Sequence, residues 1–248
     1  MLELKKPKLN IGLYVSTLII ILSLIVVFFI MYKYSVEGEA IPPFKISKLI
    51  VVSSAKTENI KKTEDTYNAE IIQNNDIRIS IEKNPEYKKE AIIRKVTINN
   101  IQIDKKQSVG DIEIYRPSRG SKLYEYKEQY KINNKIEYIG AQETYLKNEN
   151  LEISNQGGII DFSVILNNLG TIKYEENEKI TIDGKLINEL EIEQEQIKFQ
   201  IKFDLIIELE SDVKLKTKMI LELPTGNILE NGIETIEQTE MKTVFKRI

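Results

Sequence analysis

The chain has 248 residues, of which 29% are charged, and its formal net charge is −3. It contains no His, no Cys and no Trp. Without imidazole or thiol groups, it cannot form a Ser-His-Asp triad, a Cys nucleophile, a Cys/His zinc site or a disulfide.

The first strong pattern is a stretch without charged residues, 11–32. As a helix it would be about 33 Å long, which matches the hydrocarbon core of a bilayer, about 30 Å thick. Its apolar side chains cover the whole circumference, whereas a core helix of a soluble protein has a polar face. The pattern therefore predicts one transmembrane helix over 11–32.

Charges on the two flanks predict the orientation of this helix. Lys5, Lys6 and Lys8 lie in the short tail 1–10, and the other side soon reaches acidic residues. The positive-inside rule then puts the tail in the cytoplasm and the bulk of the chain outside. The expected location is the cell membrane, with a single pass and a cytoplasmic N-terminus.

A juxtamembrane linker is expected over 33–43. Its sequence bears on whether the apolar segment is retained as an anchor or removed by a signal peptidase. The apolar stretch is longer than the core of a signal peptide, which favours a retained signal anchor. The small residues Gly38 and Ala40 occupy the two positions that a signal peptidase reads, so cleavage near Ala40 remains an alternative.

Residues 44–248 read as a succession of strands. Ile is abundant and Ala occurs only five times, which favours strands over helices. A polar, exposed linker is expected over 56–66 and a hairpin turn at Asn74-Asn75-Asp76. A short helix is an alternative over 186–195. Strands are expected at 44–52, 69–73, 77–81, 96–103, 111–115, 135–141, 158–166, 171–175 and 179–182.

The clearest element is a long hairpin near the carboxyl end, formed by 197–209 and 213–223. With 210–212 as the loop, Leu209 faces Val213 and every apolar position meets another apolar position. A two-residue loop would set Leu209 against Lys214, so it is rejected. One face of this hairpin is buried and the other is solvated, as in an antiparallel sandwich.

The expected fold is therefore mainly β: one antiparallel β-sandwich over 44–248, of immunoglobulin-like or jelly-roll type, preceded by one N-terminal transmembrane helix. Two smaller sandwiches divided near residue 130 are an alternative.

A candidate binding site lies in the chain segment where tyrosines concentrate. Six of the twelve Tyr fall between 115 and 145, next to basic residues in a stretch that contains Pro and Gly. Tyr and Arg are enriched at binding hot spots, and guanidinium groups grip carboxylate or phosphate. An ordinary exposed turn followed by Tyr-bearing strands is the simpler interpretation. The candidate site residues are Tyr115, Arg116, Arg119, Lys122, Tyr124 and Tyr126.

Charge and composition also bear on the class of function. No spacing singles out two carboxylates as a general acid and base, and no calcium-loop motif is present, so we expect a non-enzymatic protein without cofactor or metal. Outside the tail the net charge is −5, which disfavours nucleic acid as a partner. The stretch 186–240 has a net charge of −8 and is interpreted as a solvated sheet face, with an acidic docking surface as the alternative.

These observations predict a binding or scaffold module of a cell envelope, anchored in the membrane and working outside it. The low Arg and Ala content points to a bacterium with an AT-rich genome. The expected partner is a protein or a cell-envelope polymer. The alternative is a structural subunit of a pilus-like or fibre-forming surface assembly, in which exposed sheet edges associate.

Overall fold

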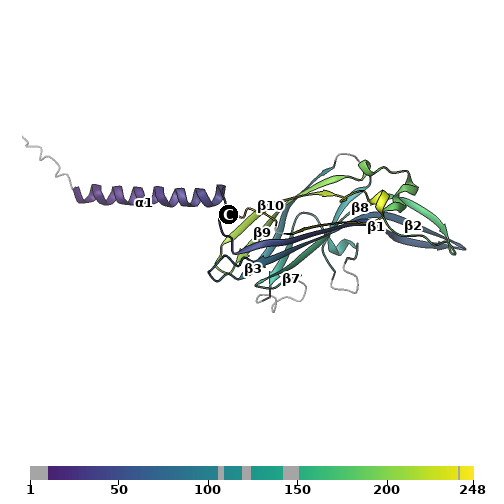
Figure 1. Ribbon diagram of the computed structural model, residues 1–248, viewed down its shortest axis with the longest axis horizontal. Coiled ribbons are helices and arrows are strands. Elements are labelled where there is room, and N and C mark those ends of the chain that lie inside the picture. Colours follow the sequence, from purple (N-terminus) through teal and green to yellow (C-terminus); the bar gives the residue numbers. More distant parts are fainter. Residues whose placement is uncertain (1–10, 106–108, 119–123, 142–150, 240) are drawn as a thin grey trace, which may run out of the picture.

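The computed structural model describes residues 11–105, 109–118, 124–141, 151–239 and 241–248 (Figure 1). Helix α1 (Ile11–Val36) extends away from a β-rich domain along the long axis of the molecule. It is about 39 Å long at the rise of an α-helix, and none of its apolar window is buried. The predicted apolar helix is thus confirmed, and it is long enough and apolar enough to cross a membrane.

The β-rich domain consists of two six-stranded sheets. All neighbouring strands are antiparallel except β6 and β7. Sheet A has the order β11 (Glu234–Thr239), β1 (Phe44–Thr63), β2 (Thr66–Lys83), β8 (Gly157–Glu175), β4 (Asp111–Tyr115), β5 (Lys131–Ile132). Sheet B has the order β12 (Lys246–Arg247), β10 (Lys214–Leu223), β9 (Phe199–Leu209), β3 (Ile93–Lys105), β6 (Ile136–Gly140), β7 (Leu151–Ile153).

The two sheets pack face to face around an apolar core, which we call the sandwich core. Alternate residues of each strand point into it, as the period-2 pattern of the sequence requires. Phe162 of sheet A meets Phe203 of sheet B edge to face, with ring centroids 5.5 Å apart. The mainly β, two-sheet architecture predicted from the sequence is therefore present. Each sheet takes strands from both sides of residue 130.

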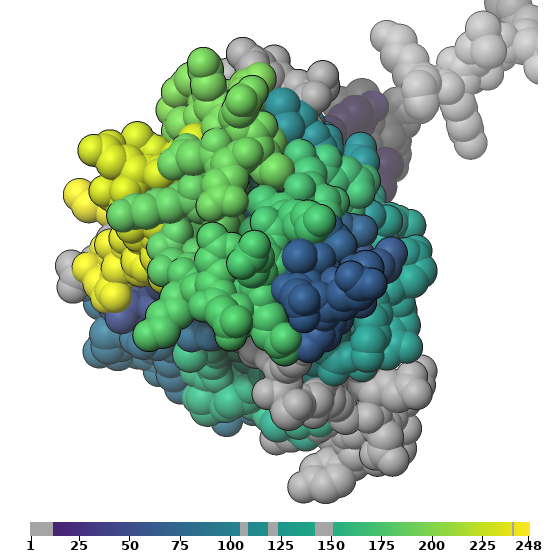
Figure 2. Space-filling model, turned by 90° about the vertical axis from the view of Figure 1, so that its right-hand side faces the viewer, coloured from purple at the N-terminus to yellow at the C-terminus, as the bar shows by residue number. Residues whose placement is uncertain are grey.

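Strands β1, β2 and β8 continue beyond the end of sheet B, toward the end of the molecule farthest from α1. Here sheet A is covered by three short helices, η3 (Gly184–Leu190), η4 (Gln194–Gln196) and α2 (Ile228–Asn231). Figure 2 looks at this end, with the segments that contain these helices in green and yellow and the tip of the β1–β2 hairpin in blue beside them. A second apolar core, the distal core, lies under this cover. It contains Ala55, Ala69, Ile71, Leu166, Ile172, Leu186, Ile187, Ile197, Ile228 and Leu229.

A buried polar layer separates the two cores. Ser53 donates to Asn75 Oδ1 at 2.7 Å, and Asn75 donates in turn to Gln73 Oε1 at 3.1 Å and to the carbonyl of Val164 at 3.0 Å. The backbone N–H of Thr225 donates to Ser53 Oγ at 2.9 Å. The polar groups of this layer therefore have hydrogen-bond partners, which offset the free-energy cost of burying them.

The predicted carboxyl-terminal hairpin is confirmed in its register. Ile207 pairs with Leu215 and Phe203 with Met219, and the N–H of Leu209 donates to the carbonyl of Val213 at 2.9 Å. On the solvated face Glu208 lies 3.4 Å from Lys214.

Several local predictions are wrong, mostly because polar residues inside long strands were interpreted as a linker or a turn. The expected linker 56–66 is strand, because β1 runs to Thr63 and turns at 64–65. Consequently Asn74-Asn75-Asp76 is not a turn but lies in the middle of β2. The side chain of Asn75 is hydrogen-bonded there within the buried polar layer. Residues 158–166 and 171–175 form one strand, β8.

Two outcomes concern the segment before β9. The strand expected at 179–182 does not form, whereas the short helix considered over 186–195 is present as two 3-10 helices, η3 and η4. The side chain of Asp183 caps η3 by accepting from the N–H of Lys185, so the Asp-Gly pair begins a helix there.

Candidate functional site

The described part of the predicted Tyr-Arg segment begins at the end of β4, and residues 124–130 lie over the outer face of sheet A. The ring of Tyr115, the last residue of β4, forms a small apolar cluster with Ile72 and Ile165. Tyr126 and Tyr130, which precedes β5, pack against it. Because Ile72 and Ile165 point opposite to the residues of the two cores, this cluster lies on the face turned away from sheet B.

A half-buried ion pair adjoins this cluster. Lys56 Nζ donates to the hydroxyl of Tyr126 at 2.9 Å and lies 3.6 Å from Asp76 Oδ2. Ser163 Oγ donates to Asp76 at 2.9 Å. Burial alone would lower the pKa of Lys56, but the neighbouring Tyr126 and Asp76 raise it overall. The amine is therefore held in its charged form.

Two further groups on this face carry shifted pKa values. Tyr124 is 7% exposed, and its hydroxyl has no hydrogen-bond partner among the described residues, so burial raises its pKa. Burial also raises the pKa of Asp161, against the opposing effect of Arg78 across the strand pair. Tyr138 of sheet B donates to the backbone carbonyl of Asp161. Such shifts gather at functional sites, and also in structural networks.

Burial limits what the tyrosines of the predicted site can do. Tyr115 is 4% exposed, Tyr124 is buried and Tyr126 is half-buried. Burial raises the pKa of Tyr115, and its hydroxyl donates to Glu113 Oε2 at 2.6 Å. These rings pack sheet A and its cover together, so they do not form an open contact surface.

The basic residues of the predicted site are placed only in part. Arg116 is half-buried, and its guanidinium carbon lies 5.3 Å from the centroid of the Tyr130 ring, a cation–π distance. Arg119 and Lys122 lie outside the described residues. A binding role of this segment stays a prediction, and it depends on Arg116, Arg119 and Lys122 more than on the rings.

The sequence interpretation missed Lys56 and Asp76, because it placed them in a linker and a turn. A signal for them exists. Extending the alternation of Ile77, Ile79 and Ile81 backwards puts Asp76 on the opposite face of the same strand, beside whatever covers that face. The signal was hidden by Asn74-Asn75, which resembles a turn.

A second candidate surface is the open edge of sheet B. Within the part of the chain that the structure describes, this edge of β10 is paired only at Leu215 and Lys216, by β12. Because the carbonyl of Lys214 accepts from the N–H of Ile248, the backbone of every second residue after it also points outward, at Lys218, Ile220 and Glu222. Ile220 is 53% exposed. A groove of about 700 Å³ lies between residues 216–220 and the segment 241–246.

The acidic stretch 186–240 spreads over several elements, namely η3, η4, β9, β10, α2 and β11. A hollow of about 530 Å³ at its centre is lined by Asp104, Glu195 and Glu222 together with polar and apolar residues. Among the described residues no group of three or more carboxylates is placed to hold a metal ion.

Comparison with known proteins finds no family model, no curated protein and no solved structure that matches this chain.

Proposed function

We propose that the protein is a single-pass membrane protein whose β-sandwich works outside the membrane as a non-enzymatic binding or scaffold module of a cell envelope. The observation that carries this proposal is the junction between α1 and the domain. The N–H of Glu39 donates to the carbonyl of Phe245 at 2.7 Å, and the Glu39 carboxylate pairs with Arg247. The guanidinium of Arg247 lies 4.8 Å from the centroid of the Tyr34 ring.

This junction supports a retained anchor. A cut after Ala40 would remove Glu39 and Tyr34, which are the two partners of Arg247. It would also remove the hydrogen bond to Phe245, a residue with a fully buried side chain. The helix is thus joined to the carboxyl-terminal strand as well as to β1, and the domain is presented at a fixed place above the membrane.

The anchor and its orientation are tested by extraction and protease digestion. The full chain, expressed in bacterial cells, is expected to stay in the membrane pellet through high salt and alkaline carbonate. Protease added outside should digest the domain, and mass spectrometry should find the intact amino terminus. Release by carbonate, protection from external protease, or a chain that begins at residue 41 would contradict the proposal.

The binding role is tested by crosslinking the full-length protein in its native membrane and identifying what is captured. The Arg116→Ala, Arg119→Ala double variant is expected to lose association with envelope material without a change in thermal stability. If the double variant captures the same molecules as the unaltered chain, the Tyr-Arg segment has no part in the proposed binding.

A second candidate function is supported by the open edge of β10: a subunit of a surface assembly that associates through this edge. The detergent-solubilised chain should then form larger species as its concentration rises, and Ile220→Lys should abolish them. A chain that stays monomeric at every concentration in gel filtration would dismiss this candidate.

A further inference from the structure

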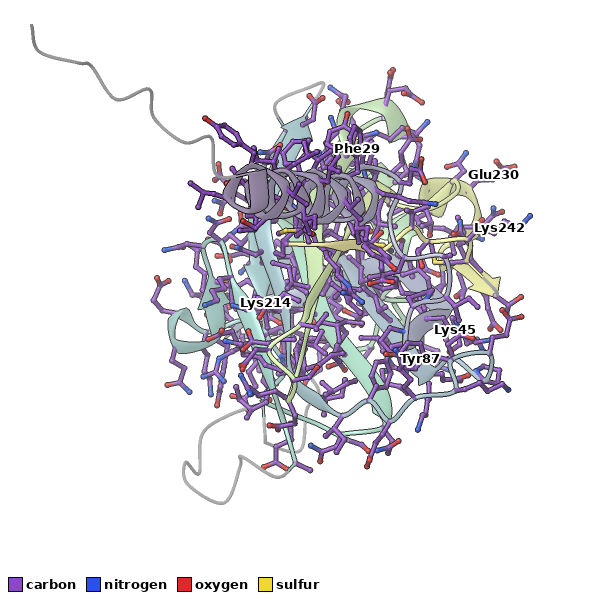
Figure 3. The ribbon with its side chains drawn as sticks, turned by 90° about the vertical axis from the view of Figure 1, so that its left-hand side faces the viewer. Phe29, Lys45, Tyr87, Lys214, Glu230 and Lys242 are labelled. Atoms are coloured by element: carbon purple, nitrogen blue, oxygen red, sulfur yellow. The ribbon has the colours of Figure 1, made fainter. Side chains whose placement is uncertain are left out.

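The elements around the end of α1 form one continuous face, which we call the helix-exit face. The loop after β2 is fixed to the linker, since Asn84 donates to the carbonyls of Pro43 at 2.8 Å and Pro42 at 2.9 Å. The N–H of Ile248 donates to the carbonyl of Lys214 at 3.1 Å, which brings the start of β10 to the same end. Figure 3 looks at this end, where Lys45, Tyr87, Lys214 and Lys242 lie below α1 and to its right.

Charge is distributed unevenly between this face and the rest of the domain. The segments that build it, 33–45, 82–94, 208–216 and 241–248, contain eleven basic and eight acidic residues, a net charge of +3. Apart from the tail 1–10, the remaining residues have 21 basic and 29 acidic side chains, a net charge of −8. The molecule is therefore polarised, with its positive end at the helix exit.

Ion pairing leaves most lysines on this face without a carboxylate, and Lys88 Nζ donates only to the carbonyl of Pro85, at 3.0 Å. Several carboxylates there are already paired: Glu37 with Lys33, Glu39 with Arg247, and Glu210 and Asp212 with Arg94. By contrast, six lysines of this face have no carboxylate within 4 Å among the described residues. Only three of its carboxylates, those of Glu82, Glu86 and Glu90, have no basic group within 4 Å among the same residues. The six lysines are Lys45, Lys83, Lys88, Lys89, Lys242 and Lys246.

The position of these lysines decides which anion they meet. The helix-exit face begins within a few residues of the apolar segment, so its lysines are turned toward the headgroups when α1 spans a bilayer. Attraction between exposed charges acts over about one Debye length, roughly 8 Å, so only charges at this end of the domain would feel the headgroups strongly. Tyr87 on the same loop is half-buried and packs against the sandwich core, which fixes the loop that carries Lys83, Lys88 and Lys89. Ile41 and Val36 also expose apolar surface there.

We propose that the helix-exit face is a second membrane-contact surface, which binds anionic phospholipid headgroups through Lys83, Lys88, Lys89, Lys242 and Lys246. The inference rests on the proposed membrane anchor. Headgroup binding holds the positive end against the bilayer, and it turns the acidic distal end outward. The domain then stands on its membrane by two contacts, the helix and the lysine-bearing face.

The absence of Cys from the chain permits a clean test with single labels. A polarity-sensitive fluorophore is attached to Glu86→Cys, which leaves every lysine of the face in place, or to Ile60→Cys at the distal end as a control. The labelled full chain is inserted into nanodiscs of phosphatidylcholine alone or mixed with phosphatidylglycerol. The probe at 86 is expected to shift to shorter wavelength only in the anionic discs, and high salt should reverse the shift. The probe at 60 should not respond.

Matched variants decide whether the lysines cause the shift. Lys83→Gln, Lys88→Gln, Lys89→Gln, made together, should lose it, whereas Lys61→Gln, Lys173→Gln, Lys179→Gln at the far end should retain it. Equal spectra in the two lipids, or equal loss in both variants, would overturn the inference. A shift produced in phosphatidylcholine discs by soluble polyphosphate, but not by phosphatidylglycerol, would assign the face to a polymeric anion and overturn the lipid proposal. A chain that does not copurify with either disc would instead refute the membrane anchor on which the inference rests.

Discussion

The sandwich core and the distal core share three strands, β1, β2 and β8, but they are closed in different ways. In the sandwich core a second sheet covers these strands, and two large aromatic rings, Phe162 and Phe203, interlock across the gap. In the distal core the same strands are covered by short 3-10 helices and one turn of α-helix. Sheet-on-sheet packing is rigid, whereas a cover of short helices can move with little loss of backbone pairing. We therefore expect global stability to reside in the first core and local opening in the second.

The largest effect is expected from Phe203→Ala. Phe203 is almost fully buried, and truncation would leave a cavity between sheets that cannot close without separating their backbones. A loss of about 3–5 kcal/mol in the free energy of unfolding is expected. Urea unfolding followed by circular dichroism measures it. Ile220→Ala, on the exposed face of the neighbouring strand, is the control and should change stability by no more than about 0.5 kcal/mol. Similar losses in both variants would contradict the assignment.

A smaller effect is expected from Ile187→Ala in the distal core. Ile187 is fully buried, yet it belongs to η3, which can settle into part of the space left behind. The expected loss is about 2 kcal/mol, at the low end for such truncations. Hydrogen exchange by mass spectrometry should show faster exchange at 56–63, with 77–81 unchanged. Equal acceleration in both ranges would mean that the polar layer does not divide the domain into separately opening parts.

The smallest effect concerns the outer face. Because the pKa of Asp161 is raised in the folded protein, the native state holds this proton more tightly than the unfolded chain. Asp161 therefore lowers stability above its folded pKa, and this cost shrinks as the pH falls below that value and is gone below the pKa of the unfolded chain. Asp161→Asn should be more stable than the unaltered chain at neutral pH, and the difference should shrink in acid. Thermal unfolding across pH measures it, with Asp65→Asn at an exposed turn as the control. A difference that grows toward low pH would refute the argument.

The elements that could be predicted are those whose pattern is local and uninterrupted. The apolar stretch 11–32 and the strict alternation of 197–209 needed no information from elsewhere in the chain. The prediction of a linker over 56–66 was wrong because the strand there is stabilised by pairing with β2 and not by its own side chains. The prediction of a turn at Asn75 was wrong for a related reason. The Asn75 amide can be buried inside a strand because Ser53 and Gln73 satisfy its hydrogen bonds.

The candidate site was harder to predict than the fold. Hot-spot composition drew attention to Tyr115 and Tyr124, but composition does not distinguish a ring that faces solvent from one that covers a sheet. The helix-exit face was not predicted at all, because Lys83, Lys88 and Lys242 are far apart in the sequence. They come to one end only through the closing of the carboxyl-terminal strand on the linker.

That closure has a mechanical consequence. A pull between α1 and the distal end is transmitted through the short linker 37–43 into β1, along the strand axis. The hydrogen bonds that join β1 to β2 and β11 run across that axis, so they are loaded together in shear and do not peel apart one at a time. The link from Glu39 to Phe245 and Arg247 gives the force a second path, into β12 and sheet B. The domain is thus arranged to resist unfolding when its distal end is pulled away from α1.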